Sequence, residues 1–127
     1  MSETEKMYSK SHEWIAFSNE TTAKIGITDY AQNELGDIVF VNLPEPGNTV
    51  TAGKQFADVE SVKAVADVYS PVTGVVKAVN EELLEHPEKI NQDAEGAWFA
   101  EIEQIIDKEQ FLDKAAYDAF AASEKKE

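Results

Sequence analysis

The sequence contains no cysteine and no arginine. Without cysteine, the 127-residue chain can form no disulfide, no thiolate metal site and no cysteine nucleophile, so any sulfur chemistry must come from an attached group. Its 11 basic residues are all lysines and are outnumbered by 25 acidic residues, which gives a net charge of −14. This charge argues against nucleic acid as a partner, because phosphate backbones would be repelled, and favours basic patches on partner proteins.

Long apolar segments are also absent. Every apolar run is short and interrupted by charged residues or glycine, whereas a membrane-spanning helix needs about 20 apolar residues. Residues 1–14 lack the apolar core of a signal peptide, so we expect a cytoplasmic protein without a membrane anchor. The length predicts one domain over residues 1–127, since single domains cluster near about 100–150 residues.

The common signatures of enzymes are missing from the sequence. It has no glycine-rich phosphate loop, no H-E-x-x-H and no G-x-S-x-G, so nucleotide, zinc and serine hydrolase chemistry have no support. The two histidines are His12 and His86, and His86 precedes a proline in an acidic segment that we expect to be solvated. We therefore predict no catalytic residue and no metal site.

Short β-prone runs separated by turn residues dominate the chain. Two of them, 13–18 and 22–27, flank a polar corner and predict a hairpin. The run from 55 to 70 contains neither glycine nor proline and is longer than the usual 3–10 residues of a strand, so it must fold back on itself. The full set of runs covers residues 13–18, 22–27, 37–43, 55–70, 74–80 and 97–103.

Helices are expected only at the margins of this β structure. Residues 28–36 predict a short helix with Thr28 or Asp29 as N-cap, and 80–91 predict a helical turn closed by Pro87. A C-terminal helix is expected at about 107–121, followed by a frayed tail at 122–127. Its apolar stripe would consist of Leu112, Ala116, Ala119 and Phe120. Together these elements predict a mainly β fold, a small flattened sandwich with peripheral helices.

Lys63 lies in the middle of the long β-prone run. The simplest interpretation is a strand lysine whose stem covers apolar surface while its ammonium reaches water. Other segments change this view, namely ESVKA at 60–64, SPVTG at 70–74, SHEW at 11–14 and GITDYAQNELGDIVFVNLPEPG at 26–47. In this order and at this length, the chain resembles the glycine cleavage system H proteins.

The resemblance implies a fold and a position for this lysine. H proteins have a barrel-sandwich hybrid fold of the lipoyl-domain type with short peripheral helices, which would place the core at about 7–105. In that fold the modified lysine occupies a tight hairpin tip, so residues 55–70 would be two strands folded about Lys63. The turn itself was not predictable from Val62-Lys63, because tight hairpins favour glycine or asparagine.

The resemblance also implies a cofactor and partners. Lipoate would be joined to Lys63 through an amide by a lipoate ligase or a lipoyl or octanoyl transferase. Glycine decarboxylase, with pyridoxal phosphate, would load an aminomethyl group onto the arm, and an aminomethyltransferase would pass the carbon to tetrahydrofolate. Dihydrolipoamide dehydrogenase would then reoxidise the dithiol. The chain itself would be a non-catalytic carrier, which we expect to be a monomer.

A cleft for the loaded arm is the last implication of the resemblance. Matching the SHEW and SVKAxxD motifs gives Glu13 and Asp67 the task of holding the cationic aminomethyl group, with Ser11 and His12 nearby. Strand periodicity independently places Asp67 on the face of Lys63, because alternate residues of a strand share a face. Without the family, both carboxylates would be read as solvated surface residues.

Three other interpretations compete with this one. Biotinyl carriers share the hairpin, but their lysine usually lies between methionines, whereas Val62 and Ala64 flank Lys63. An H-like protein could relay lipoyl groups to other enzymes, and an unmodified structural domain would leave Lys63 free. The intact mass of protein from its native host separates a lipoyl, a biotinyl and a free lysine.

The charge balance yields a prediction about association. If basic patches on the decarboxylase and the transferase attract this acidic chain, raising the salt concentration toward 1 M will slow association strongly, because the Debye length then falls to about 3 Å. Stopped-flow association rates across a salt series measure the effect. A rate independent of salt would show that the acidic residues serve solubility alone.

Overall fold

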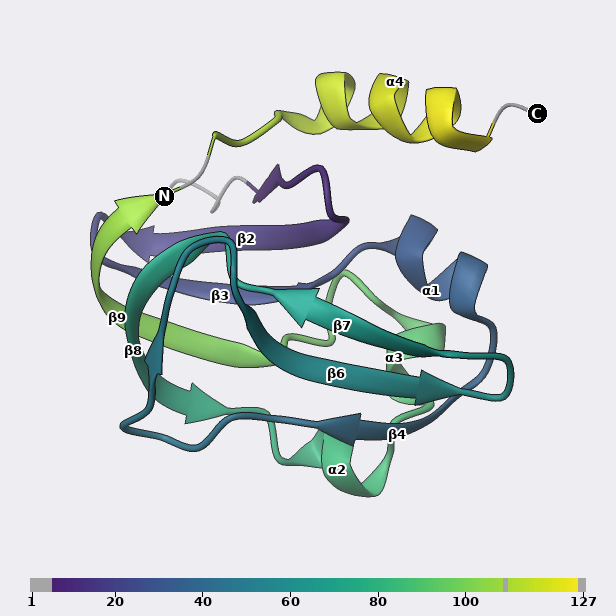
Figure 1. Ribbon diagram of the computed structural model, residues 1–127, viewed down its shortest axis with the longest axis horizontal. Helices are drawn as coiled ribbons and strands as arrows, with labels where there is room; N and C mark the ends of the chain where they lie inside the picture. The colour runs from purple at the N-terminus through teal and green to yellow at the C-terminus, as the bar shows by residue number, and fades with distance from the viewer. Residues whose placement is uncertain (1–5, 109, 126–127) are drawn as a thin grey trace.

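The computed structural model describes residues 6–108 and 110–125. In this part of the chain, strands alternate with a few short helices before a longer helix near the C-terminus (Figure 1). The elements in order are β1 (Lys6–Tyr8), β2 (Glu13–Asn19), β3 (Thr22–Ile27), α1 (Asp29–Leu35), β4 (Ile38–Asn42), β5 (Thr49–Val50), β6 (Gln55–Ser61), β7 (Val65–Tyr69), β8 (Val72–Val79), α2 (Glu82–Glu85), α3 (Lys89–Gln92), β9 (Ala100–Lys108) and α4 (Lys114–Lys125).

The strands form two antiparallel sheets. The larger has the order β1-β2-β3-β9-β8-β5 and the smaller the order β4-β6-β7. The smaller sheet lies in front in Figure 1, where the turn between β6 and β7 projects at one edge. The sheets are not closed into a barrel. The expected mainly β fold with peripheral helices is confirmed.

Alternation along the strands decides which residues enter the core. In β6, Ala57 and Val59 are buried while the alternate residues Asp58 and Glu60 are not, because successive side chains of a strand point to opposite faces. One apolar cluster joins the inner face of the small sheet to α2 and α3, and a second lies on the large sheet. The outer face of the small sheet carries a mixture of acidic and exposed apolar side chains.

The predicted hairpin and first helix are confirmed. β2 pairs with β3 through the predicted polar corner. The Oγ1 atom of Thr28 accepts a hydrogen bond from the Ala31 N–H at 3.2 Å, which makes Thr28 the N-cap of α1. Gly36 ends the helix with a φ of 83°, a conformation that glycine adopts without steric cost.

The expected bounds of the C-terminal helix are wrong. β9 continues to Lys108, where Asp107 and Lys108 pair with β8, and α4 begins only at Lys114 and runs to Lys125. Asp107 resembles an N-cap in sequence, but pairing between strands prevails, and the Asp113 carboxylate instead accepts a hydrogen bond from the Ala116 N–H at 2.8 Å. Residues 122–125 therefore extend the helix instead of fraying, while 126–127 lie outside the described residues.

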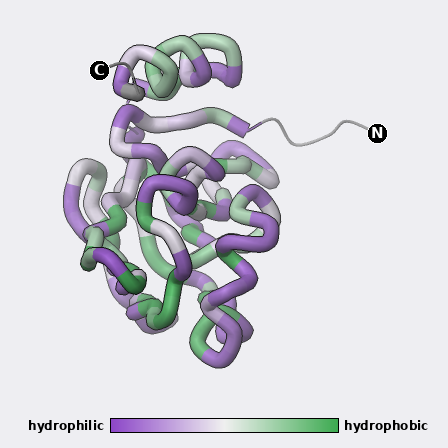
Figure 2. The backbone as a smooth tube through the Cα atoms, turned by 90° about the vertical axis from the view of Figure 1, so that its right-hand side faces the viewer, coloured by the Kyte–Doolittle hydropathy of each residue, from purple (hydrophilic) through white to green (hydrophobic). Residues whose placement is uncertain are grey.

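The buried face of α4 also differs from the predicted apolar stripe. Its buried residues are Tyr117 and Ala121, whereas Ala116 and Ala119 are exposed. Figures 1 and 2 show α4 as the outermost element on the side of β1. Elsewhere, residues 80–91 form parts of two helices, α2 and α3, and two short strands, β1 and β5, were not predicted.

Candidate functional site

Lys63 lies at the tip of the β6–β7 hairpin, as the resemblance implied. The two strands pair in the register Glu60 to Val65, and the Ser61 N–H donates to the Ala64 carbonyl at 2.8 Å to close the turn. The Ser61 hydroxyl oxygen accepts from the N–H groups of Lys63 and Ala64, each at 3.0 Å. The serine side chain thus accepts backbone N–H groups of the turn, as asparagine and aspartate side chains do in other turns. Sequence reasoning missed this role of Ser61.

The tip is fixed against the end of α1. The Val62 N–H donates to the Asp37 carbonyl at 3.0 Å, which ties the turn to the segment between α1 and β4. A Cβ atom on Gly36 would lie 3.2 Å from Lys63 Cε, so the lysine stem rests against backbone that carries no side chain. Lys63 is exposed, and yet the stem of its side chain has a defined position against Gly36.

A cleft of about 310 Å³ lies beside the stem of Lys63. Leu35, which precedes Gly36, lines it together with other residues of α1, of the small sheet and of the β1–β2 turn. Its apolar lining consists of Ile27, Ala31, Leu35, Val59, Ala66 and Val68. Its polar lining consists of Ser11, His12, Glu13, Tyr30, Glu34, Asp67 and Glu124. The structure therefore brings Ser11, His12, Glu13 and Asp67 together in one cleft.

Glu13 is not a solvated strand-end carboxylate, because it is only 2% exposed. Its Oε1 atom accepts hydrogen bonds from the hydroxyls of Ser9, at 2.6 Å, and Ser11. Its Oε2 atom accepts from the Tyr69 N–H at 3.1 Å. Since Glu13 begins β2 and Tyr69 ends β7, this carboxylate joins the two sheets.

Asp67 lies in a different environment from Glu13. It is exposed on β7, opposite Asp58 of β6, and it shares its face with Val65 and Tyr69. The alternation that placed Asp67 on the face of the hairpin tip is thus present. Of the two carboxylates, Asp67 is the one directly accessible to a cation that enters the cleft.

His12 connects the cleft to α4. Its Nδ1 atom lies 2.7 Å from Tyr117 Oη, and its Nε2 atom lies 2.7 Å from Glu124 Oε1. The Tyr117 hydroxyl also lies 2.7 Å from Thr28 Oγ1. Burial raises the pKa of Tyr117 to about 12, so its hydroxyl keeps its proton at neutral pH.

Several lining residues were missed by sequence reasoning. Glu34 and Tyr30 belong to α1, and one turn of helix separates them, a spacing that puts both on one face. That spacing was visible in the sequence, but nothing in it indicated which face of the helix would meet the cleft. Glu124 lies in the part of the chain that was expected to fray.

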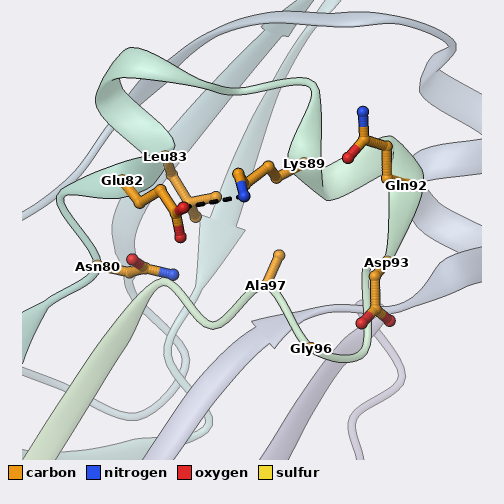
Figure 3. Close-up of a pocket in the computed structure, with 8 residues that line it drawn as sticks. All are labelled: Asn80, Glu82, Leu83, Lys89, Gln92, Asp93, Gly96 and Ala97. Atoms are coloured by element: carbon orange, nitrogen blue, oxygen red, sulfur yellow. Dashed lines mark ion pairs between the residues drawn. The ribbon is translucent and has the colours of Figure 1, made fainter.

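A smaller cavity of about 210 Å³ lies on the other side of the small sheet's core, around α2 and α3 (Figure 3). The Lys89 ammonium and the Glu82 carboxylate form an ion pair of 2.9 Å across it, while Leu83 and Ala97 supply apolar surface. None of the predicted site residues lines this cavity. The lysine of this cavity is already paired with Glu82, so we place the functional site at the cleft beside Lys63.

Metal binding and membrane insertion find no support in residues 6–108 and 110–125. No cluster of three or more histidine or acidic side chains suited to a metal ion occurs there. His86 lies near Glu88, at 3.1 Å, in an exposed segment. No helix of the described part is both long and apolar enough to cross a bilayer.

An exposed lysine on a rigid hairpin tip, beside a cleft with an apolar base and a polar rim, defines the class of covalent carrier domains related to lipoyl domains. The family model for the glycine cleavage H-protein matches residues 6–124. The chain belongs to this family, and it is accordingly a non-catalytic lipoyl carrier of glycine cleavage, not an enzyme.

Individual relatives agree with this assignment. The chain is 58% identical over 118 residues to a glycine cleavage system H protein of Lachnoclostridium phytofermentans, with 93% of each chain covered. It is 54% identical over 119 residues to that of Acidobacterium capsulatum, with 92% of each covered. A crystal structure of the H protein from Mycobacterium marinum superposes with a TM-score of 0.84 at 33% identity and covers 98% of this chain and 100% of the other.

The turn hydrogen bonds of Ser61 give a prediction. Ser61→Ala removes the acceptor for two N–H groups, so we expect about 0.5–1.5 kcal/mol lower unfolding free energy and a several-fold slower acylation of Lys63. Urea unfolding and the initial rate of lipoylation measure the two effects. Ser61→Thr keeps the hydroxyl and is the matched control. An unchanged acylation rate in Ser61→Ala would show that the enzyme does not need this turn preformed.

Proposed function

We propose that Lys63 carries lipoate in amide linkage and that the cleft beside it holds the arm when the arm bears the aminomethyl group of glycine. The observation that carries this proposal is the position of the lysine stem. It rests on Gly36, next to Leu35, which lines the cleft. An arm extended from Lys63 along α1 would therefore enter the cleft without rearrangement of the backbone.

The residues of the cleft fit the group chemically. When attached, the lipoyl group supplies a disulfide that takes up the aminomethyl group on one sulfur and becomes a thiol at the other. The apolar lining suits the hydrocarbon chain and the ring, since both gain from leaving water. The carboxylates on the rim suit the ammonium, because a charge-assisted hydrogen bond is shorter and stronger than a neutral one.

The carboxylates have different tasks in this proposal. Asp67 is exposed on the hairpin and would contact the ammonium directly. Glu13 would add negative charge from its buried position in the lining of the cleft. Hydroxyls of Ser9 and Ser11 and a backbone N–H hold its carboxylate there. His12 would shape the wall of the cleft toward α4. Ser11 would then act through Glu13, whose carboxylate it helps to orient.

Exposed apolar side chains surround Lys63 and support the proposed partners. Val39, Phe40, Val62 and Val65 are all exposed, and Phe40, Glu60 and Val65 lie in one row across the small sheet. A mixed apolar and acidic surface suits enzymes that present an apolar pocket with a basic rim. We assign as partners glycine decarboxylase, the aminomethyltransferase, dihydrolipoamide dehydrogenase, and the ligase or transferase that acylates Lys63.

The proposed cellular location and the proposed monomeric state follow from the chemistry and the task of the arm. A carrier whose dithiol is reoxidised by a dedicated enzyme suits the cytoplasm, where thiols are otherwise kept reduced. We propose that it works as a monomer, because it must present the same hairpin to several enzymes in turn. The alternatives of a biotinyl carrier or a lipoyl relay are not favoured by the family assignment.

The attachment site is tested by replacing the lysine. Lys63→Arg keeps the charge but offers no primary amine, so intact-mass measurement after incubation with a lipoate ligase, lipoate and ATP should show no added lipoyl group. The unfolding free energy should change by less than about 0.5 kcal/mol, as for other exposed sites. Lys54→Arg, directly before the start of β6, is the control and should be lipoylated normally. Lipoate found on another lysine of the wild-type chain would refute the assignment.

Asp67→Asn tests the cleft. The substitution removes the charge and keeps the shape, so the aminomethyl group should be lost to water about fivefold faster from the isolated carrier, as expected for loss of about 1 kcal/mol at a partly shielded site. The half-life of the loaded carrier at fixed pH and salt measures this. Reoxidation by the dehydrogenase should not change, because the unloaded arm has no cation.

Asp58→Asn is the matched control for Asp67→Asn. Asp58 pairs opposite Asp67 across the same sheet but does not line the cleft. Equal half-lives for the wild type and both variants would mean that Asp67 is an ordinary surface carboxylate. Glu13→Gln is a poorer test, because a buried carboxylate that joins two sheets cannot be altered without disturbing the fold.

A further inference from the structure

The attachment of α4 is narrow and concentrated at one place. Within residues 114–124 of this helix, only Tyr117 and Ala121 are buried, and Phe120 is half-buried. The Tyr117 ring stacks on Tyr8 of β1, with centroids 4.9 Å apart and an interplanar angle of 18°. Lys114 and Asp118 of α4 form an ion pair of 3.0 Å with one another, and the Lys114 ammonium lies 5.9 Å from the centroid of the Tyr8 ring. The attachment of α4 to the body of the protein thus depends on one aromatic side chain, Tyr117, and its neighbours.

That aromatic side chain belongs to a continuous chain of hydrogen bonds. Thr28 Oγ1 accepts from the Ala31 N–H at the start of α1, so its own proton can be donated to Tyr117 Oη. The Tyr117 hydroxyl can then donate to His12 Nδ1, and His12 Nε2–H can donate to Glu124 Oε1. All four side chains are satisfied when His12 is neutral with its proton on Nε2. The chain ends at Glu124, which lines the arm cleft.

The backbone conformation of His12 indicates that surrounding contacts hold this residue in its position. Its φ of 75° is in the left-handed region, which non-glycine residues rarely adopt. The turn is held there by the His12 N–H, which donates to the Ser9 carbonyl, and by the His12 carbonyl, which accepts from the Thr28 N–H. The ring lies against Tyr30, with centroids 4.6 Å apart, and near Phe120, at 5.8 Å. His12 is therefore packed between α1 and α4, at the wall of the cleft.

We propose that His12 and Tyr117 are positioning residues that latch α4 against the body of the protein, so that α4 forms the outer wall of the arm cleft with Glu124 facing it. This inference rests on the proposed function, because it assigns α4 a part in shielding the loaded arm. The latch does not touch Lys63 or the hairpin tip. Its loss should therefore expose the parked arm without affecting attachment of lipoate.

The absence of cysteine makes shielding of the arm directly measurable. A loaded arm keeps one free thiol, and since the chain has no cysteine, a thiol-alkylating reagent labels the arm alone. The experiment uses the full-length lipoylated chain, loaded by glycine decarboxylase and then isolated, and follows alkylation by N-ethylmaleimide with intact-mass measurement. Hydrogen exchange of the α4 amides in the chain without lipoate gives a second readout that does not involve the arm.

Tyr117→Phe is the main variant, because it keeps the ring stacked on Tyr8 and removes only the hydroxyl that joins His12 to Thr28. We expect alkylation of the loaded arm to be at least threefold faster, faster hydrogen exchange in α4 and an unchanged rate of lipoylation. Glu124→Gln, a substitution at an exposed side chain, should accelerate alkylation in the same direction. Asp118→Asn changes a carboxylate of α4 that does not line the arm cleft, so it is the control and should behave as the wild type.

Two results would overturn the latch. Wild-type alkylation rates in both Tyr117→Phe and Glu124→Gln would show that α4 does not shield the arm, even if its amides exchange faster. Equal acceleration in Asp118→Asn would show a general effect of helix charge and not a specific wall. A wild-type arm that reacts as fast as free dihydrolipoamide, or a chain that accepts no lipoate, would instead refute the proposed function, and this inference with it.

Discussion

The carboxylate of Glu13 is the contact on which the geometry of the site depends. Glu13 is the first residue of β2 in the large sheet. Its carboxylate accepts a hydrogen bond from the backbone N–H of Tyr69, at the end of β7 in the small sheet. A buried carboxylate is costly unless several donors satisfy it, and here hydroxyls of Ser9 and Ser11 contribute as well. The cost is offset only when the two sheets meet in one arrangement. That arrangement sets the distance between the β1–β2 turn and the hairpin, and so creates the cleft.

The hairpin tip is built by a second set of short-range contacts. Ser61 closes the turn, and the Asp37 carbonyl holds it from outside. Gly36 serves two purposes at once, since its left-handed backbone ends α1 and its missing side chain leaves room for the stem of Lys63. The lysine is thereby mobile at its ammonium but fixed at its base. In the proposed function, the enzyme that acylates this amine would meet a preorganised target and avoid the entropy of ordering a loop.

The sequence allowed most of the fold to be predicted, but only parts of the site. Periodicity and turn residues identified the β2–β3 hairpin and α1, because local hydrogen bonds and alternation decide these elements. The start of α4 was misplaced since Asp107 looks like a cap, and only its pairing with Thr73 in β8 shows that it belongs to a strand. The burial of Glu13 and the part of Glu124 in the cleft arise from contacts between distant segments. No local pattern carries that information, and even the position of Lys63 at a tip came from family resemblance and not from turn chemistry.

In the proposed function, the distribution of charge would let one cleft hold a loaded arm and release an unloaded one. Acylation would remove the positive charge of Lys63 from a chain that already has a net charge of −14. An aminomethyl ammonium would restore a positive charge at the end of the arm, in the cleft that Asp67 and the buried Glu13 line. A binding site can favour one state only by its difference in affinity for the two states. In the proposed function that difference would be the cation itself, so transfer of the carbon unit would remove the attraction and free the arm with no need for a change in the fold.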